Sequence, residues 1–337
     1  MPTGARSPSG RGRIVAFVAI VAVCALGGGT FVAIAALGGD GSTSEARVAR
    51  AVAEAPPSIK GERVLVRAAD PEDPGLDGSV AIARLGMDAR PRPTGLACSR
   101  VYMAGGRGIC LKLAGTGVEY SVVVFDRSFR QVASLGLNGL PSRARVSPDG
   151  RLGTVTSFVT GHSYASSGEF STNTRLLDLR RGRYIADLED FTVVNGGEPM
   201  EAPDFNFWGV TFERDGDGFY ATLSTGSHRY LVHGSVRARR VEVLRDRVEC
   251  PSLSPDGARI AYKRTLGGGR WRPHVLDLRT GADRPLAESR SIDDQLEWAG
   301  NRFVLYGDGE DVYLVAADGS GAPRRMLGRA ASPTVLE

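Results

Sequence analysis

The sequence lacks the short motifs that mark the common catalytic sites of hydrolases and oxidoreductases. It contains no Gly-x-Ser-x-Gly elbow, no His-Glu-x-x-His helix and no Cys-x-x-Cys pair. These absences exclude the serine hydrolases, zinc peptidases and dithiol enzymes that depend on those motifs. Histidine is also scarce, and we expect each of the four to be a surface or core imidazole rather than a ligand: His162, His228, His233 and His274.

Lysine is nearly absent, since 42 residues are basic and only Lys60, Lys112 and Lys263 are lysines. The net charge is +4, and the small basic clusters Arg180–Arg183 and Arg237–Arg240 fall at expected strand ends or turns. A nucleic-acid-binding face needs basic residues clustered on one surface. We therefore expect no nucleic-acid partner. The preference for arginine, together with abundant alanine and glycine, suggests a GC-rich bacterial genome.

Cysteine is limited to four residues, and they differ in setting. Cys24 lies in an apolar run near the N-terminus. Cys98 and Cys110 flank the glycine-rich turn Gly105–Gly108 on what read as adjacent strands, so outside the cytoplasm they predict a disulfide worth about 3 kcal/mol. Cys250 has no evident partner and is predicted to be a buried free thiol.

What the sequence does contain is an internal repeat. The phrase Arg-Val-Ser-Pro-Asp-Gly at Arg145–Gly150 returns as Ser-Leu-Ser-Pro-Asp-Gly at Ser252–Gly257. In each copy Pro sets the backbone for a turn, Asp bonds to nearby backbone, and Gly supplies a left-handed residue, so two strands meet in a tight hairpin. A Leu-Asp-Leu-Arg phrase follows each copy about 25 residues later. Repeats of this kind predict a β-propeller in which each blade is one copy.

The spacing of the repeat predicts six blades. Degenerate copies end at Gly216 and Gly300, and intervals near 42 residues fit a four-stranded blade. The expected units are Arg63–Thr94, Ser99–Leu137, Arg143–Asp190, Asn206–Leu244, Val248–Ala287 and Gln295–Arg329. The first unit lacks an innermost strand, and the tail Ala331–Leu336 resembles the start of the repeat. We predict that this tail pairs with the first blade and closes the ring, with a frayed tail as the alternative.

The N-terminal region predicts a membrane anchor. Ile14–Leu37 is uncharged and long enough to cross a bilayer as a helix. Arginines within residues 1–13 predict that this segment is a cytoplasmic tail. The chain that follows the span is then expected outside the bacterial cytoplasmic membrane. A cleaved signal peptide is the competing interpretation, although its apolar region is usually shorter. Residues 38–61 then form a juxtamembrane linker, in which Glu45–Ala55 is expected to be a short helix that ends at Pro56.

Candidate binding residues lie in loops expected on one face of the propeller, around the mouth of its channel. These loops are Thr160–Thr174, Asn195–Trp208 and Ser291–Gln295, which together bring hydroxyls, aromatic rings and carboxylates to that mouth. The candidates are His162, Tyr164, Glu198, Asp204, Trp208, Asp293, Asp294 and Gln295. No loop has the spacing of a calcium-binding motif, and we expect no bound metal or cofactor. Solvated turns are the alternative interpretation.

The Ser-Pro-Asp-Gly turns, the Leu-Asp-Leu-Arg strands and the phrase Val312–Gly319 resemble the repeats of TolB-like six-bladed β-propellers. The resemblance spans about Arg63 to Leu336 and implies a periplasmic or extracellular scaffold for protein interactions, often with a ligand at the channel mouth. The chain departs from TolB in having an anchor and linker where TolB has an N-terminal partner domain, so TolB's own partner role is not carried over.

The resulting hypothesis is an all-β, six-bladed propeller at residues 62–337, preceded by one transmembrane helix. We expect a non-catalytic extracytoplasmic binding or scaffold protein whose partner is an unidentified envelope protein or small ligand. The alternative is a metal-dependent hydrolase, because related propellers include lactonases. That enzyme would use Glu198, Asp204 and Asp294, and it requires these carboxylates to converge on the channel axis.

Overall fold

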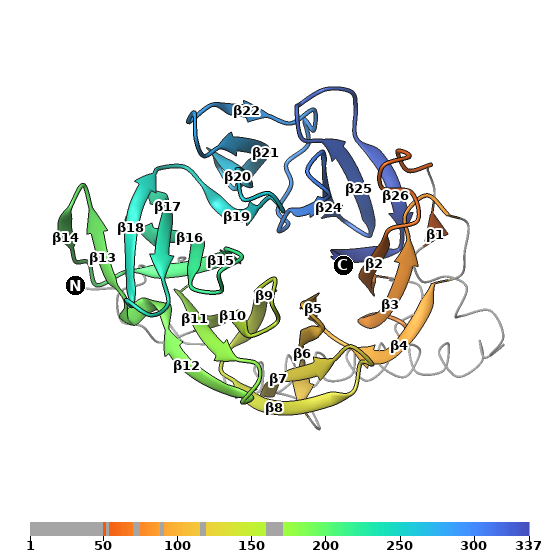
Figure 1. The fold of residues 1–337 in the computed structure, drawn as a ribbon, viewed down its shortest axis with the longest axis horizontal. Coiled ribbons are helices and arrows are strands. Elements are labelled where there is room, and N and C mark those ends of the chain that lie inside the picture. The colour runs from red at the N-terminus through yellow and green to blue at the C-terminus, as the bar shows by residue number, and fades with distance from the viewer. Residues whose placement is uncertain are drawn as a thin grey trace, which may run out of the picture. The chain divides into compact units, whose positions relative to one another are not determined.

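Within the unit Glu45–Glu337, six β-sheets are arranged around a common centre, as the computed structural model shows (Figure 1). The structure describes residues 50–51, 54–69, 75–87, 91–114, 119–159 and 171–336. Each sheet is a blade that runs from an innermost strand at the centre of the ring to an outermost strand at its periphery. The predicted all-β, six-bladed propeller is confirmed.

Blades 1 to 3 each have four antiparallel strands. Blade 1 is formed by β27 (Ala330–Leu336), β2 (Arg63–Ala68), β3 (Ser79–Arg84) and β4 (Arg92–Ala97). Blade 2 contains β5 (Arg100–Ala104), β6 (Arg107–Ala114), β7 (Glu119–Asp126) and β8 (Gln131–Leu137). Blade 3 contains β9 (Leu140–Val146), β10 (Leu152–Val159), β11 (Ser171–Asp178) and β12 (Arg183–Asp187).

Blades 4 and 6 carry extra strands at their outer edges. Blade 4 contains β15 (Asn206–Phe212), β16 (Gly218–Thr225), β17 (His228–Ser235) and β18 (Arg240–Arg245), and a short 3-10 helix η2 (Leu188–Asp190) leads into its added hairpin β13 (Thr192–Asn195) and β14 (Glu198–Met200). Blade 5 contains β19 (Glu249–Leu253), β20 (Arg259–Gly267), β21 (Arg270–Asp277) and β22 (Asp283–Pro285). Blade 6 contains β23 (Glu297–Ala299), β24 (Phe303–Asp308), β25 (Asp311–Ala316) and β26 (Arg324–Gly328), with β1 (Arg50–Ala51) added at its edge.

The Ser-Pro-Asp-Gly phrase forms the predicted hairpin between the first two strands of a blade. The N–H of Gly150 donates to the carbonyl of Ser147 (2.8 Å), and Gly150 has φ +69°, which a residue with a Cβ rarely adopts. The hydroxyl of Ser147 accepts from the N–H of Leu152 at 2.9 Å, which ties the turn to the second strand. Ser254 and Gly257 repeat the same backbone hydrogen bond at 2.8 Å.

The hydrophobic core is divided among the interfaces between neighbouring blades. Each of the six interfaces holds one cluster of buried apolar side chains. Between blades 2 and 3, for example, Ile109 and Leu111 pack against Val155, and all three are fully buried. Gly153 lies in this interface, where an added Cβ would come within 2.5 Å of Ile109 Cδ1. A small residue there allows the two sheets to approach closely.

The C-terminal strand closes the ring as predicted. β27 runs antiparallel to β2, with Val64 opposite Val335 and Arg63 opposite Leu336, and it supplies the innermost strand that the first blade lacked. The sheet of blade 1 therefore combines β27, from the end of the chain, with β2, β3 and β4, from near its beginning. Pairing of this kind removes a free inner edge that would otherwise be open to other chains.

The expected helix at Glu45–Ala55 is wrong where the structure describes it, because Arg50–Ala51 form β1 and pair with β26. Ala55 and Ile59 are 3% and 2% exposed and belong to the core cluster between blades 6 and 1. Strand pairing at Arg50–Ala51 and burial of Ala55 and Ile59 against the propeller replace the local helix pattern there. The expected anchor Ile14–Leu37 lies outside the described residues. Among the residues described, no helix is long and apolar enough to span a membrane.

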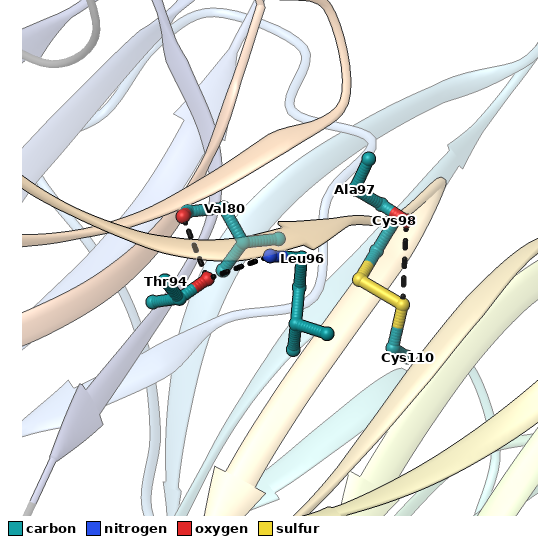
Figure 2. The surroundings of a disulfide bond; sticks show 6 residues. All are labelled: Val80, Thr94, Leu96, Ala97, Cys98 and Cys110. Carbon is teal, nitrogen blue, oxygen red and sulfur yellow. Dashed lines mark hydrogen bonds between the residues drawn. A yellow bond between two sulfur atoms is a disulfide. The ribbon is translucent and has the colours of Figure 1, made fainter. Parts of the chain in front are cut away.

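The predicted disulfide between Cys98 and Cys110 is confirmed, with Cα atoms 5.4 Å apart (Figure 2). Cys110 lies in β6, whereas Cys98 precedes β5 and donates its N–H to the carbonyl of Gly78 in blade 1 (2.7 Å). The bond therefore ties the crossover between blades 1 and 2 to the second strand of blade 2. Cys250 is a buried free thiol, as expected.

We expect replacement of both Cys98 and Cys110 by alanine to lower the free energy of unfolding by about 3 kcal/mol. A cross-link that closes a loop of this length restricts the unfolded chain by about that amount. Denaturant unfolding with and without dithiothreitol checks the value. Dithiothreitol should destabilise the parent chain and leave the double variant unchanged. Equal sensitivity of both proteins to the reductant would contradict the prediction.

Candidate functional site

A cavity lies on the propeller's central channel, at the end formed by the Ser-Pro-Asp-Gly turns. Its volume is about 720 Å³. All six innermost strands or their turns contribute side chains, so we call it the wide chamber. Its lining includes Glu62, Tyr102, Ala104, Arg145, Asp149, Thr211, Glu213, Arg214, Ser252, Pro255, Glu297, Trp298 and Leu336.

A buried guanidinium closes the inner end of the wide chamber. Nη1 of Arg145 donates to Oε2 of Glu297 at 2.5 Å, across the channel from blade 3 to blade 6. Nη2 donates to Oγ of Ser252 in blade 5 (3.1 Å) and to the carbonyl of Leu296 (3.3 Å). The amide oxygen of Gln295, in the orientation that satisfies both its polar atoms, accepts from Nε of Arg145 at 3.0 Å. Every nitrogen of this guanidinium therefore has a partner.

Two further groups complete this arrangement, which we call the Arg145 network. The guanidinium carbon of Arg145 lies 4.5 Å from the ring centre of Tyr102 in blade 2. The hydroxyl of Tyr102 donates to Oε1 of Glu297 (3.3 Å), which also accepts the N–H of Val335 in blade 1 (3.2 Å). The side chains of Arg145 and Glu297 are only 5% and 8% exposed. Burial raises the pKa of the Glu297 carboxyl, and the nearby Arg145 opposes that rise.

One carboxylate oxygen on the chamber wall has no hydrogen-bond partner among the described residues. Oε2 of Glu62 is buried without a hydrogen bond, and burial raises the pKa of this carboxyl. Asp149, by contrast, forms an ion pair with Arg151, and Oε1 of Glu213 lies 3.3 Å from Nε2 of His233. Glu62 thus differs from Asp149 and Glu213 in having one carboxylate oxygen that is buried without a partner among the described residues.

The candidate residues from the blade 3 and blade 4 loops are not brought together where the structure describes them. Glu198 is exposed on β14, at the outer edge of blade 4. Both carboxylate oxygens of Asp204 hold the β16–β17 turn, through the hydroxyl of Thr225 and the N–H of Gly226 (2.6 Å each). Trp208 is 8% exposed in β15. His162 and Tyr164 lie outside the described residues.

The candidates from blade 6 do lie on the channel, on the far side of the Arg145 network from the wide chamber. Asp294 and Gln295 line a smaller cavity there. Asp293 forms an ion pair with the buried Nζ of Lys263, and its Oδ1 is 3.6 Å from Nη2 of Arg143. Oδ2 of Asp294 accepts the N–H of Gly307 at 2.7 Å. Lys263 and the two arginines at positions 100 and 143 hold the pKa of Asp293 below its usual range despite burial.

The arrangement required for a metal-dependent hydrolase is not seen in the described part of the chain. No group of three or more His, Cys, Asp or Glu side chains there could hold a metal ion. Glu198 lies on the outermost strand of blade 4, and Asp294 lies at the channel, so those two carboxylates do not converge.

Gln295 was predicted from the sequence as a site residue, but the other residues of the Arg145 network were not, although the repeat contains a signal for some of them. Arg145, Thr211 and Ser252 each stand five positions before the glycine that ends a copy of the repeat, and all three line the wide chamber. Gln295 holds the same position before Gly300 and contacts Arg145. Equivalent positions in the repeat therefore identify side chains on the channel.

Fold and channel together define a six-bladed β-propeller, and comparison with solved structures agrees on this fold. TolB from Acinetobacter baumannii matches 84% of this chain and 68% of its own with a TM-score of 0.60 at 17% identity. A chain of a nidogen/laminin complex matches with a TM-score of 0.54 at 10% identity, covering 82% of this chain and 98% of its own.

A puromycin-hydrolyzing peptidase from Mycobacterium tuberculosis matches with a TM-score of 0.51 at 14% identity, covering 85% of this chain and 46% of that one. At these identities the likeness establishes the fold alone. No protein-family model matches the chain, and no curated protein matches its sequence.

Proposed function

We propose that the protein is a non-catalytic extracytoplasmic binding or scaffold protein, anchored in the bacterial cytoplasmic membrane by Ile14–Leu37. Its ligand, a small molecule or a segment of an envelope protein, enters the wide chamber. The observation that carries this proposal is the chamber's volume of about 720 Å³, which lies in the range of ligand pockets. Its polar groups are fixed in advance, because the Arg145 network holds them in hydrogen bonds from five blades.

Within the chamber, Glu62 and the exposed rim residue Arg214 supply charges for contact with a ligand, and Trp298 and Tyr102 supply aromatic surface. The rim is built from short turns with internal hydrogen bonds rather than from long loops. A rigid rim lowers the entropy lost on binding. These features favour recognition of a bound segment by a preformed surface.

The anchored arrangement also limits how far the propeller stands from the lipid. β1 pairs with the edge of blade 6, so residues 38–49 are the whole span between the proposed helix and the propeller. At roughly 3.5 Å for each extended residue, the linker reaches about 40 Å at most.

Fusion of alkaline phosphatase to the C-terminus tests the anchored topology. We expect the phosphatase to be active when it is fused to the C-terminus and inactive when it is fused ahead of Ile14. The mass of the mature protein should include Ile14–Leu37. A mature mass that begins after Ala35, with the protein released from membranes, would instead establish a cleaved signal peptide.

Site-specific photo-crosslinking in cells tests binding at the chamber. A benzophenone amino acid at Arg214, on the chamber rim, should give a discrete adduct, whereas the same probe at Arg324, exposed on β26, should not. Ala104→Trp narrows the chamber and should abolish the Arg214 adduct while leaving the melting temperature unchanged. Equal adducts at both positions, or an adduct that survives Ala104→Trp, would remove the chamber from the proposal.

A further inference from the structure

Exposed apolar side chains of the propeller gather on one face. We call it the loop face, because it lies opposite the Ser-Pro-Asp-Gly turns and carries the connections between the second and third strands of the blades. Among the described residues seven large apolar side chains are exposed, and five of them stand at strand ends that meet the loop face. These five are Leu113, Leu140, Phe158, Leu244 and Leu266. One exposed leucine needs no explanation, whereas several on one face indicate an interaction surface.

One of these side chains, Leu266, stands at the tip of the β20–β21 hairpin in blade 5. A bulge between Thr265 and Gly267 leaves Leu266 without an opposite residue, and its side chain is 53% exposed. Gly267–Gly269 all have positive φ, between +60° and +79°, which closes the tip tightly and which other residues rarely adopt. Trp271 follows the tip and is partly exposed. The hairpin therefore presents an aliphatic side chain and an indole to solvent.

Two exposed arginines accompany this hairpin. Arg270 belongs to it, and Arg247 lies nearby, because the buried carboxylate of Glu249, two residues further on, accepts the indole N–H of Trp271 at 2.9 Å. Arg247 and Arg270 are both exposed, and neither forms an ion pair with any residue that the structure describes. Their guanidinium groups are thus available to a negatively charged partner.

The neighbouring acids, by contrast, are engaged within the protein. Oδ2 of Asp283 accepts from Arg245 of blade 4 and from Arg264 of blade 5, at 2.8 and 2.7 Å. This shared contact also joins the loop-face ends of β18 and β20. The carboxylate of Asp246 lies 3.1 Å from Nδ1 of His228. The charge left over on this part of the loop face is therefore positive.

The described chain also begins at the loop face. β1 runs antiparallel to β26, and Arg50 lies opposite Gly328, the residue at the loop-face end of β26. Residues 38–49 would therefore connect this face of the propeller to the proposed anchor, Ile14–Leu37. A short connection of this kind makes a bilayer surface a partner within reach of the loop face.

Given the membrane anchoring proposed above, we propose that the loop face of blades 4 and 5 binds the surface of an anionic lipid bilayer. Leu266 and Trp271 enter the boundary between headgroups and acyl chains, where apolar and indole side chains are favoured. Arg247 and Arg270 bind lipid phosphates, whose geometry the guanidinium group matches. The wide chamber, formed among the turns on the opposite face, then stays open to solvent.

Quenching of tryptophan fluorescence by brominated lipid tests this contact in the unmodified full chain. Trp208 and Trp298 are only 8% and 5% exposed, so Trp271 is the tryptophan most accessible to lipid. The chain is reconstituted in vesicles whose acyl chains carry bromine. We expect quenching in mixtures of phosphatidylcholine and phosphatidylglycerol and much weaker quenching in phosphatidylcholine alone. Trp271→Phe should remove the quenching that depends on phosphatidylglycerol.

Reversal of the two exposed charges tests the role of the arginines. One arginine near an anionic surface strengthens contact about fivefold, so Arg247→Glu/Arg270→Glu should lower the equilibrium constant for lipid contact by at least roughly 25-fold. Arg180→Glu/Arg183→Glu is the matched control, because both arginines are exposed on the opposite face, at the β11–β12 turn. The control should leave the quenching unchanged, and neither pair should alter the melting temperature.

Flotation of the same vesicles separates a failure of this contact from a failure of the anchor. A chain that floats with the vesicles but shows no quenching from Trp271 would overturn the lipid contact alone, whereas a chain that stays behind would contradict the anchor and the contact together. Equal quenching with and without phosphatidylglycerol would overturn the assignment to anionic lipid. Emission from Trp271 that shifts with protein density, without quenching by bromine, would overturn it in favour of a second copy of the chain.

Discussion

Removal of the chain from Ala330 onward is expected to abolish the folded monomer, at a cost of more than about 5 kcal/mol. This deletion takes away β27, the innermost strand of blade 1, exposes the edge of β2 and removes apolar contacts beside it. Val64, Leu65 and Val66 of that strand are fully buried, and each such side chain contributes about 1.5–3 kcal/mol when buried. The loss is comparable to the whole stability of many domains. Near-ultraviolet circular dichroism and size-exclusion chromatography measure the outcome.

Restoring the fold with an added peptide provides the control for this deletion. A synthetic peptide of residues 330–337 should add back as a strand and restore the near-ultraviolet spectrum, whereas a peptide of the same composition in scrambled order should not. A shorter deletion that removes only Leu336 and Glu337 should have a much smaller effect, because Thr334 and Val335 still pair with β2. A truncated chain that melts at the parent temperature would show that the closing strand is dispensable.

Blade number and ring closure could be predicted because their signals are local. The phrase at Ser147–Gly150 specifies a hairpin through its own hydrogen bonds, and the phrase recurs at the spacing of a blade. The tail at Ala331–Leu336 repeats the beginning of that phrase, and this was enough to assign its pairing. The disulfide could likewise be predicted, since Cys98 and Cys110 lie close together on either side of one turn.

The helix expected at Glu45–Ala55 failed for the opposite reason. A capping pattern and residues with high helix propensity indicate only the conformation that an isolated segment prefers. Here the partners are distant in sequence: β1 pairs with β26, and Ile59 is buried against residues such as Leu327. Tertiary pairing and burial outweigh a preference of a few tenths of a kcal/mol per residue.

The wide chamber likewise depends on contacts between residues that are distant in the sequence. The polar loops led the sequence analysis to place the binding site on the face that carries the connections between blades. The width of the channel, however, depends on which side chains meet across it. Arg145 and Glu297 are 152 residues apart and belong to opposite blades. Their pairing closes the channel near the loop face and leaves the wide chamber at the turn face. The repeat holds a signal for the channel-facing positions that the sequence analysis did not use, and the structure showed both those positions and which of them pair.

Replacement of Arg145 by methionine is expected to lower the free energy of unfolding by about 3–5 kcal/mol, the usual cost of leaving one member of a buried ion pair alone. Glu297 would keep its hydrogen bonds from Tyr102 and Val335 but would lose its ion pair with the guanidinium of Arg145. Arg151→Met is the matched control, because its ion pair with Asp149 is partly exposed and contributes at most about 1 kcal/mol. Denaturant unfolding of each variant measures the difference.

The double variant Arg145→Met/Glu297→Leu separates the penalty of an unpaired charge from the contribution of the pair. Apolar replacement of a whole buried pair is often close to neutral, so the double variant should be more stable than Arg145→Met alone. Its remaining loss would reflect Ser252 and Tyr102, whose polar groups lose Arg145 and Glu297 as partners. If the two single losses simply add, the residues are not coupled, and the Arg145 network does not bind the blades together across the channel.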